Sequence, residues 1–203
     1  MLDYFVAAFA GPGAGFMYAI TALLAYAVSV AIERAFVLGV ASRVDDAGVR
    51  QRLEQGDVAG AAELAGSTPM GTVLAAGAAE DDVALAWEAM SAAAIDAEAA
   101  LRRRVQHLAA VSNLATMLGL LGTVYGLILA FSALGDASAG ERAVRLSEGI
   151  STAMATTAYG LLVGIPALGL HAWLDGVAGA RLARIEAAAG RLALALRRAS
   201  SDG

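Results

Sequence analysis

Three apolar stretches, each long enough to cross a lipid bilayer, are the feature that most restricts how this chain can fold. They cover residues 13–40, 108–134 and 149–174, and the last two contain no Asp, Glu, Lys or Arg except at their edges. A membrane-spanning helix needs about 20 mostly apolar residues. Of the 203 residues, 59% are hydrophobic, and the mean hydropathy is +0.65. The pattern predicts an all-α membrane protein with three transmembrane helices.

The first twelve residues are expected to form a separate element. The sequence "MLDYFVAAF" is followed by Gly11-Pro12-Gly13, and we expect a short interfacial helix and a turn over residues 1–12. A secretory signal peptide is not expected, because Asp3 stands where such a peptide carries positive charge.

The arginines between the apolar stretches predict the orientation of the chain. Segments 41–107 and 175–203 are rich in arginine, whereas 135–148 is not. In that segment the charged side chains are Arg142, Arg145, Asp136, Glu141 and Glu148. By the positive-inside rule, the N-terminus and the short loop 135–148 are periplasmic, and the other two segments are cytoplasmic.

The cytoplasmic segments are expected to be helical. Short capped helices are predicted by acidic residues at helix starts and by the positions of Gly56, Gly66 and Pro69. From Asp82 no strong breaker appears for about fifty residues, so we expect one helix that continues through the second span. Helical stripes run along it and beyond the third span: Trp87, Met90, Ala94, Ala97, Leu101, Val105 and Leu108, then Leu182, Ile185, Ala189, Leu192 and Leu196.

The composition disfavours several classes of function. The chain has no cysteine, and its two histidines, His107 and His171, are far apart, so no metal site or other cofactor is expected. No nucleic-acid patch, nucleophile–base pair or phosphate loop is visible, so neither nucleic-acid binding nor enzymatic activity is expected. His171 is either a candidate proton relay or an ordinary interfacial residue.

Small residues line one face of each of the last two spans. The members are Ser112, Thr116, Gly119, Thr123, Gly126, Ala130 and Ala133, then Gly149, Ala153, Thr157, Gly160, Gly164, Ala167 and His171. Gly122 with Gly126, and Gly160 with Gly164, also form GxxxG pairs, which allow close helix packing in lipid. Two interpretations stay open: packing seams whose hydroxyls bond to their own helices, or a shared lining surface.

The two spans also carry recognisable motifs. "LATMLGLLGTVYGLILAFSAL" and "EGISTAMATTAYGLLVGIPALGLHAWL" resemble the paired spans of the MotA/TolQ/ExbB proton-channel family, and "IERAFVL" and "LEQGDVAGAAEL" extend the resemblance. The three-span topology is most similar to the TolQ/ExbB branch. The resemblance implies a stator subunit in the bacterial inner membrane that converts proton-motive force into mechanical work. It also implies a homo-oligomer, a pentamer, around an ExbD/TolR-like single-span partner carrying a membrane aspartate.

The resemblance assigns pore-lining roles to Thr123 and Thr157. It places Pro166 in the family's IPA motif, either as a kink in the third span or as local helix geometry without a switching role. The chain departs from the family at Thr152, where many TolQ and ExbB proteins have a glutamate.

The departure leaves the last two spans without a carboxylate at depth, so the partner must supply one. This chain would contribute a hydroxylated surface that includes Thr123, Thr152, Thr156, Thr157 and Tyr159. The alternative function is a non-conducting oligomeric membrane scaffold. Neither the ion, H⁺ or Na⁺, nor the energised system follows from the sequence.

Overall fold

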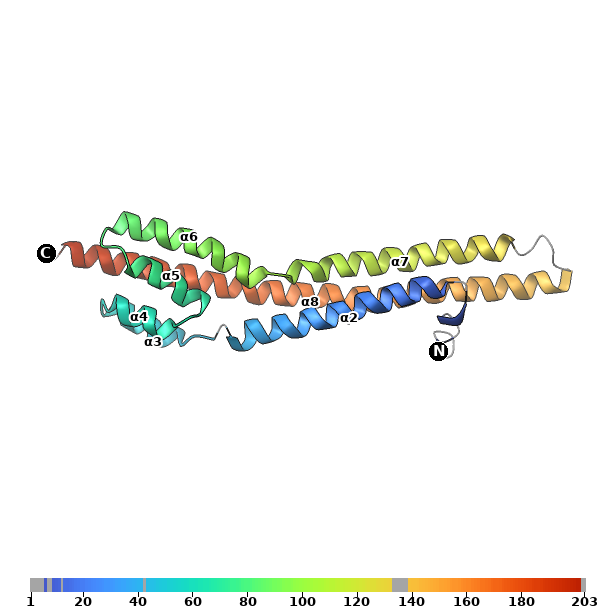
Figure 1. The fold of residues 1–203 in the computed structure, drawn as a ribbon. Helices are drawn as coiled ribbons and strands as arrows, with labels where there is room; N and C mark the ends of the chain where they lie inside the picture. The colour runs from blue at the N-terminus through green and yellow to red at the C-terminus, as the bar shows by residue number, and fades with distance from the viewer. Residues whose placement is uncertain (1–5, 7–8, 12, 42, 133–138, 202–203) are drawn as a thin grey trace. The chain divides into compact units, whose positions relative to one another are not determined.

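Every element that the structure describes is helical (Figure 1), which confirms the predicted all-α class. The computed structural model describes residues 6, 9–11, 13–41, 43–132 and 139–201, so the predicted interfacial helix lies mostly outside it. Three regions are long and apolar enough to span a membrane: Ala14–Gly39, Val83–Ser132 and Glu141–Ser201. The elements are α2 (Ala14–Phe36), the π-helical turn η1 (Val37–Ala41), α3 (Asp46–Glu54), α4 (Val58–Ala65), α5 (Pro69–Ala78), α6 (Val83–Arg102), α7 (Val105–Ser132) and α8 (Ala139–Ser201).

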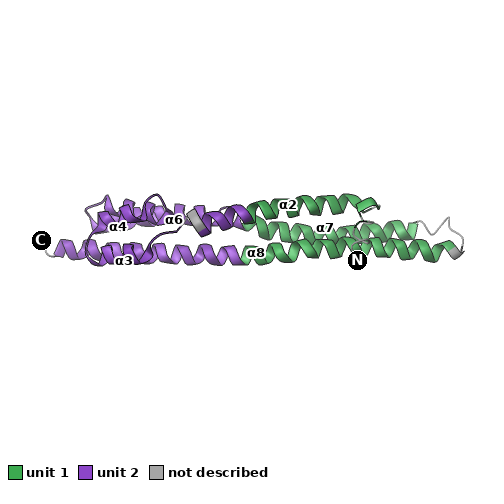
Figure 2. Ribbon diagram, turned by 90° about the horizontal axis from the view of Figure 1, so that it is seen from below, with its two compact units in different colours: residues 1–31, 106–172 green, residues 32–105, 173–203 purple. Residues whose placement is uncertain are grey.

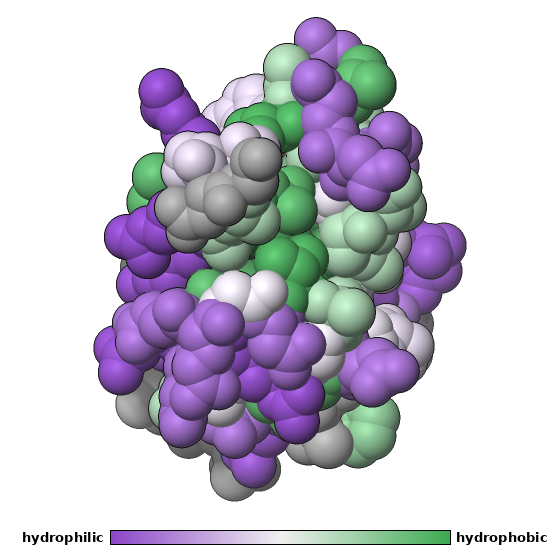
Figure 3. Space-filling view, turned by 90° about the vertical axis from the view of Figure 1, so that its left-hand side faces the viewer, coloured by the Kyte–Doolittle hydropathy of each residue, from purple (hydrophilic) through white to green (hydrophobic). Residues whose placement is uncertain are grey.

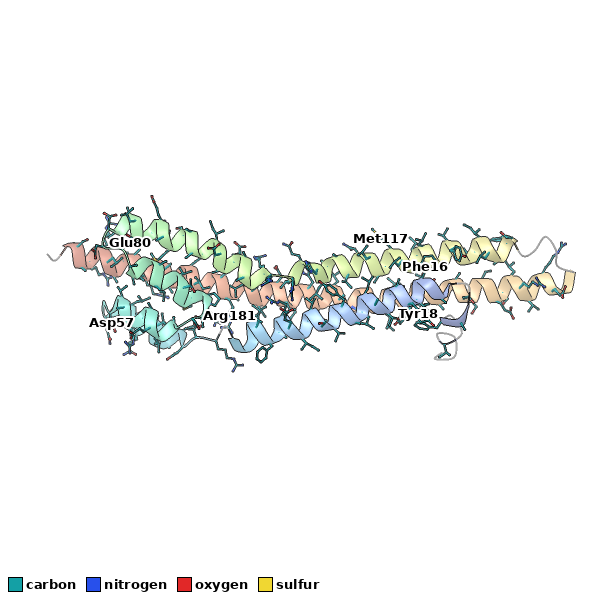
Figure 4. All side chains as sticks on the ribbon, in the orientation of Figure 1. Phe16, Tyr18, Asp57, Glu80, Met117 and Arg181 are labelled. Atoms are coloured by element: carbon teal, nitrogen blue, oxygen red, sulfur yellow. The ribbon has the colours of Figure 1, made fainter. Side chains whose placement is uncertain are left out.

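The chain divides into two units (Figure 2). Unit 1 comprises residues 1–31 and 106–172, and its described helices come from α2, α7 and α8. Ile20, Ala115 and Val163, one from each helix, form its buried core. Much of the remaining surface is apolar and exposed; Met117, for example, stands on the outer side of α7 (Figure 4).

Unit 2 comprises residues 32–105 and 173–203, and it contains the predicted short capped helices. The side chains of Asp45, Asp57, Thr68 and Asp82 each accept a hydrogen bond from the backbone N–H of a first-turn residue, as N-caps do. The glycines after α3 and α4 have positive φ angles of 79° and 61°. Seen from its end, unit 2 has hydrophilic side chains around a hydrophobic centre (Figure 3).

The predicted stripe on α6 is wrong at Trp87, which is 51% exposed. Ala86 is fully buried instead, and the buried line continues through Met90, Ala97 and Leu101. Ala86 lies one four-residue step before Met90, so the helix turns Trp87 outward. On α8 the predicted stripe agrees better with the observed burial, because Ile185, Ala189 and Leu192 are buried.

The single helix expected from Asp82 through the second span is also wrong, because the chain leaves helical geometry at Arg103 and Arg104. Arg103 has ψ 128°, and Arg104 has a positive φ of 61°. Ion pairs flank the break: Arg104 Nη1 lies 2.6 Å from Glu33 Oε2, and Arg102 Nη1 lies 2.9 Å from Asp175 Oδ1. These long-range contacts override the local helix propensity, so no Gly or Pro marks the break.

Arg34, on α2, adds further contacts near the break at Arg103 and Arg104. It is only 5% exposed, its Nη2 pairs with Glu33 Oε1 at 2.6 Å, and its Nη1 donates to the carbonyl of Ala100 at 3.4 Å. Glu33 thus pairs with both Arg34 and Arg104.

Helix α8 begins earlier than expected. Residues 139–148, which belong to the loop expected over 135–148, are instead its first turns, and residues 133–138 lie outside the described residues. The helix continues on both sides of Pro166 and reaches Ser201, so the predicted helical extension after the third span is present.

Replacement of Arg104 tests whether the positive φ is imposed by the fold. Arg104→Gly and Arg104→Ala both remove the ion pair with Glu33, but only glycine adopts a positive φ freely. We expect the Gly variant to be more stable than the Ala variant by about 1–2 kcal/mol, measured by thermal unfolding in detergent. In an ordinary helix alanine is the more stable of the two, so the normal order would contradict the break.

Candidate functional site

Helices α7 and α8 touch backbone to backbone at Gly119 and Gly160. A Cβ atom added to Gly160 would lie 2.6 Å from the carbonyl oxygen of Ala115 and 3.0 Å from Gly119 Cα. A Cβ on Gly119 would lie 2.9 Å from the carbonyl oxygen of Thr156. Real Cβ atoms do not approach backbone this closely, so only glycine permits this contact.

The other predicted packing glycines lie along the same contact. A Cβ on Gly122 would meet Thr156 Oγ1 at 2.8 Å, and one on Gly126 would meet Ala153 Cβ at 2.9 Å. A Cβ on Gly164 would meet Thr116 Oγ1 at 2.7 Å. The structure therefore brings together the five glycines Gly119, Gly122, Gly126, Gly160 and Gly164, which we call the seam glycines. Pro166 lies outside this contact, on an exposed side of α8.

Three of the predicted ion-path threonines gather beside the seam glycines; we call Thr123, Thr156 and Thr157 the threonine cluster. Thr123 Oγ1 lies 2.9 Å from the carbonyl oxygen of Ala153 across the helices, and Thr157 Oγ1 lies 3.0 Å from that of Gly119. The two hydroxyls also lie within hydrogen-bond distance of each other, so when one donates to the other, only the second donates to a carbonyl. Each hydroxyl has one proton and two lone pairs, so the cluster can exchange donor and acceptor roles.

Thr156 differs from its two neighbours because it is fully buried. Its Oγ1 lies 2.7 Å from the carbonyl oxygen of Ala153 and 3.2 Å from that of Gly119. The Thr123 and Thr157 side chains are half-buried. Thr156 therefore fills the helix contact, whereas Thr123 and Thr157 keep an accessible edge.

Thr152, the remaining predicted ion-path residue, lies in a groove next to the cluster. The groove has a volume of about 270 Å³. It is lined by Gly13, Gly122, Gly126, Leu129, Ala130, Arg145, Glu148, Gly149, Thr152, Ala153 and Thr156. Six of these residues are Gly or Ala, and the scarcity of side-chain volume leaves the space open.

Tyr159 faces α2 rather than the threonine cluster. Its hydroxyl lies 2.9 Å from Thr21 Oγ1, and its ring packs against the core of unit 1. A second aromatic contact was missed: Tyr26 Oη lies 2.6 Å from His107 Nδ1. The two residues are 81 positions apart and belong to no motif, so the sequence carries no signal for the pair.

Charged and metal-binding groups are scarce around this site. In the described part of unit 1 the carboxylates are Glu141 and Glu148, and α7 contributes none. Among the described residues no group of three His, Cys, Asp or Glu side chains could hold a metal ion. The site is a cluster of hydroxyls and backbone carbonyls in apolar surroundings, and these groups can solvate a small ion or a proton.

Comparison with known proteins places this geometry in a family. The family model described as "MotA/TolQ/ExbB proton channel family" matches residues 65–187, which include all of α7 and most of α8. The chain belongs to this family. The seam glycines and the threonine cluster therefore lie within the part of the MotA/TolQ/ExbB fold that the family model describes.

Two relatives in the MotA/TolQ/ExbB family illustrate the level of similarity. The chain is 39% identical over 74 residues to the "Putative biopolymer transport protein ExbB-like 2" of Helicobacter pylori, which covers 36% of this chain and 49% of that protein. It is 43% identical over 82 residues to the "Putative biopolymer transport protein ExbB-like 1" of Synechocystis sp., which covers 39% of this chain and 32% of that protein. The chain thus spans half or less of the length of these relatives.

Alanine at Gly160 tests the helix contact. Gly160→Ala places a methyl group against backbone on α7, so we expect a lower midpoint of thermal unfolding in detergent. The matched control is Gly169→Ala on the same helix, where a Cβ would meet nothing within 4 Å. The control should be neutral or stabilising by up to about 1 kcal/mol, because alanine favours the helix. Equal effects of the two substitutions would argue against a tight contact at Gly160.

Proposed function

We propose that this chain is the ion-conducting stator subunit of a TolQ/ExbB-type motor in the bacterial inner membrane. The observation that carries the proposal is the meeting of the Thr123 and Thr157 hydroxyls across α7 and α8. Both lie at the motif positions to which the family resemblance assigns the pore, and both keep an accessible edge in otherwise apolar helices. Family membership supports a proton-channel role at the coarser level.

The proposed assembly is a homo-oligomer, a pentamer, around an ExbD/TolR-like single-span helix with a membrane aspartate. Two facts are consistent with a partner. First, only 22%, 22% and 33% of the apolar windows of the three candidate spans are buried within one chain, so most residues of these windows are left to contact lipid or other subunits. Second, α7 has no carboxylate, and a titratable group is the usual means of moving protons through a membrane.

In this proposal α7 and α8 face the partner and α2 faces lipid, with a periplasmic N-terminus and a cytoplasmic C-terminus. Thr123 and Thr157 line the ion path. Thr156 is assigned to helix packing, because its side chain has no exposed surface.

The alternative, a non-conducting scaffold, is favoured by one specific observation. Each hydroxyl of the threonine cluster already has a partner within the chain, as in a pure packing motif. An ion-flux experiment separates the two functions.

Removal of two hydroxyls tests conduction. Thr123→Val and Thr157→Val keep the side-chain shape, and each lost hydroxyl leaves an ion or the partner carboxylate less solvated by about 1–3 kcal/mol. The membrane potential supplies about 2.3 kcal/mol per charge per 100 mV. We therefore expect the double variant to lower ion flux at least 5-fold in liposomes that contain the protein with its single-span partner.

The matched control for this test is Thr116→Val. The Thr116 hydroxyl donates to the backbone carbonyl of Ser112, in its own helix, at 2.9 Å. Flux in this control should stay within twofold of the unsubstituted protein, and all variants should keep the same oligomeric state. Unchanged flux in the double variant would reject the hydroxyl-lined path. No flux in the unsubstituted complex would favour the scaffold.

The exposed apolar surface also predicts the assembly state. Native mass spectrometry of the protein in mild detergent should show a homo-oligomer, with five copies as the expected number. A stable monomer across a range of mild detergents would contradict the stator assembly.

A further inference from the structure

Three polar side chains line the groove beside the threonine cluster without a polar contact to any other described residue: the half-buried Thr152 and the exposed Arg145 and Glu148. Within the described residues, Thr152 Oγ1 takes part in no hydrogen bond, and Arg145 and Glu148 form no ion pair. The other four threonines of α7 and α8 each have a backbone carbonyl oxygen within hydrogen-bond distance; they are Thr116, Thr123, Thr156 and Thr157. A hydroxyl in a helix normally bonds back to the preceding turn, so the free Thr152 hydroxyl is an exception.

The groove has space for a hydrated ligand. Its volume is about 270 Å³, and a water molecule occupies about 30 Å³ in the liquid, so several can fit. Neighbouring Gly122, Gly126 and Gly149 present no side chains to fill it. The unpaired hydroxyl, carboxylate and guanidinium give such waters polar partners.

We propose that this groove is an ion-binding site in which Glu148 and Thr152 hold a hydrated monovalent cation, hydronium or Na⁺, before it reaches the threonine cluster. This inference rests on the proposed conducting function. It assigns to this chain a carboxylate of its own, in addition to the one expected from the partner.

The spacing along α8 connects the groove to the cluster. Glu148, Thr152 and Thr156 follow one another at four-residue steps, each a rise of about 6 Å along a helix. Thr156, the packing residue of the threonine cluster, also borders the groove, and its fully buried side chain is not itself an ion ligand. Because α8 is already helical from Ala139, Glu148 stands in the third turn of a helix and has a fixed position relative to Thr152.

The charges fit a cation that binds and leaves. Glu148 supplies the negative charge, and the only other described carboxylate of unit 1, Glu141, does not line the groove. Arg145, three residues before Glu148, also lines the groove and offsets part of the attraction. Conduction requires binding strong enough to admit an ion and weak enough to release it.

The test compares ion flux in liposomes that contain the protein with its partner, under an H⁺ gradient in one arm and a Na⁺ gradient in the other. Glu148→Gln should lower flux of the conducted ion at least 5-fold. The control Glu141→Gln removes the same charge two turns earlier on α8 and should stay within twofold. The double variant Glu148→Gln/Thr152→Glu, which moves the carboxylate one turn deeper in the same groove, should recover at least half of the lost flux.

Each outcome bears on the proposal. Flux in Glu148→Gln equal to that in Glu141→Gln would overturn the ion-binding site and leave the proposed channel intact. A loss in Arg145→Gln without a loss in Glu148→Gln would indicate an anion site and would also overturn it. No flux in the unsubstituted complex under either gradient would reject the conducting function and this inference together. Equal oligomeric state in all variants excludes misassembly as the cause of a loss.

Discussion

Contact between the backbones of α7 and α8 is the constraint on which the rest of unit 1 depends. Lipid chains are as apolar as leucine, so helices in a bilayer associate through close packing and hydrogen bonds rather than through a hydrophobic driving force. At Gly119 and Gly160 the packing is as close as the backbone permits. The same approach brings the carbonyl of Gly119 within 3.0 Å of the Thr157 hydroxyl on the facing helix. Close packing and the polar cluster are therefore one structural feature.

This coupling means that a packing role and a lining role are not exclusive. Thr156 is fully enclosed, and its hydroxyl lies within hydrogen-bond distance of two carbonyl oxygens, so it belongs to the interior of the helix pair. Thr123 and Thr157 bond to the same carbonyls but are half-buried. Within the threonine cluster, Thr156 thus stabilises the packing of α7 against α8, whereas Thr123 and Thr157 present accessible hydroxyls at the edge of the same helix pair.

Local patterns in the sequence predicted most of the helices, because caps, breakers and small-residue faces act over a few residues. The helix end at Gly66 and the start of α5 at Pro69 are of this kind. The sequence did not predict the break at Arg103 and Arg104, whose ion-pair partners Glu33 and Asp175 are more than seventy residues away. For the same reason the seam glycines were predictable as a face, whereas the enclosure of Thr156 and the free hydroxyl of Thr152 required the facing helix.

The junction between α6 and α7 has a mechanical consequence. Where a helix is continuous, bending is resisted by its own hydrogen-bond ladder, whose strength hardly depends on salt. At Arg104 that ladder is interrupted, and the local conformation is held partly by an ion pair whose side chains are 44% and 38% exposed. Exposed charges are screened by dissolved ions. The break in the helix therefore depends on ionic strength more than an uninterrupted helical turn does.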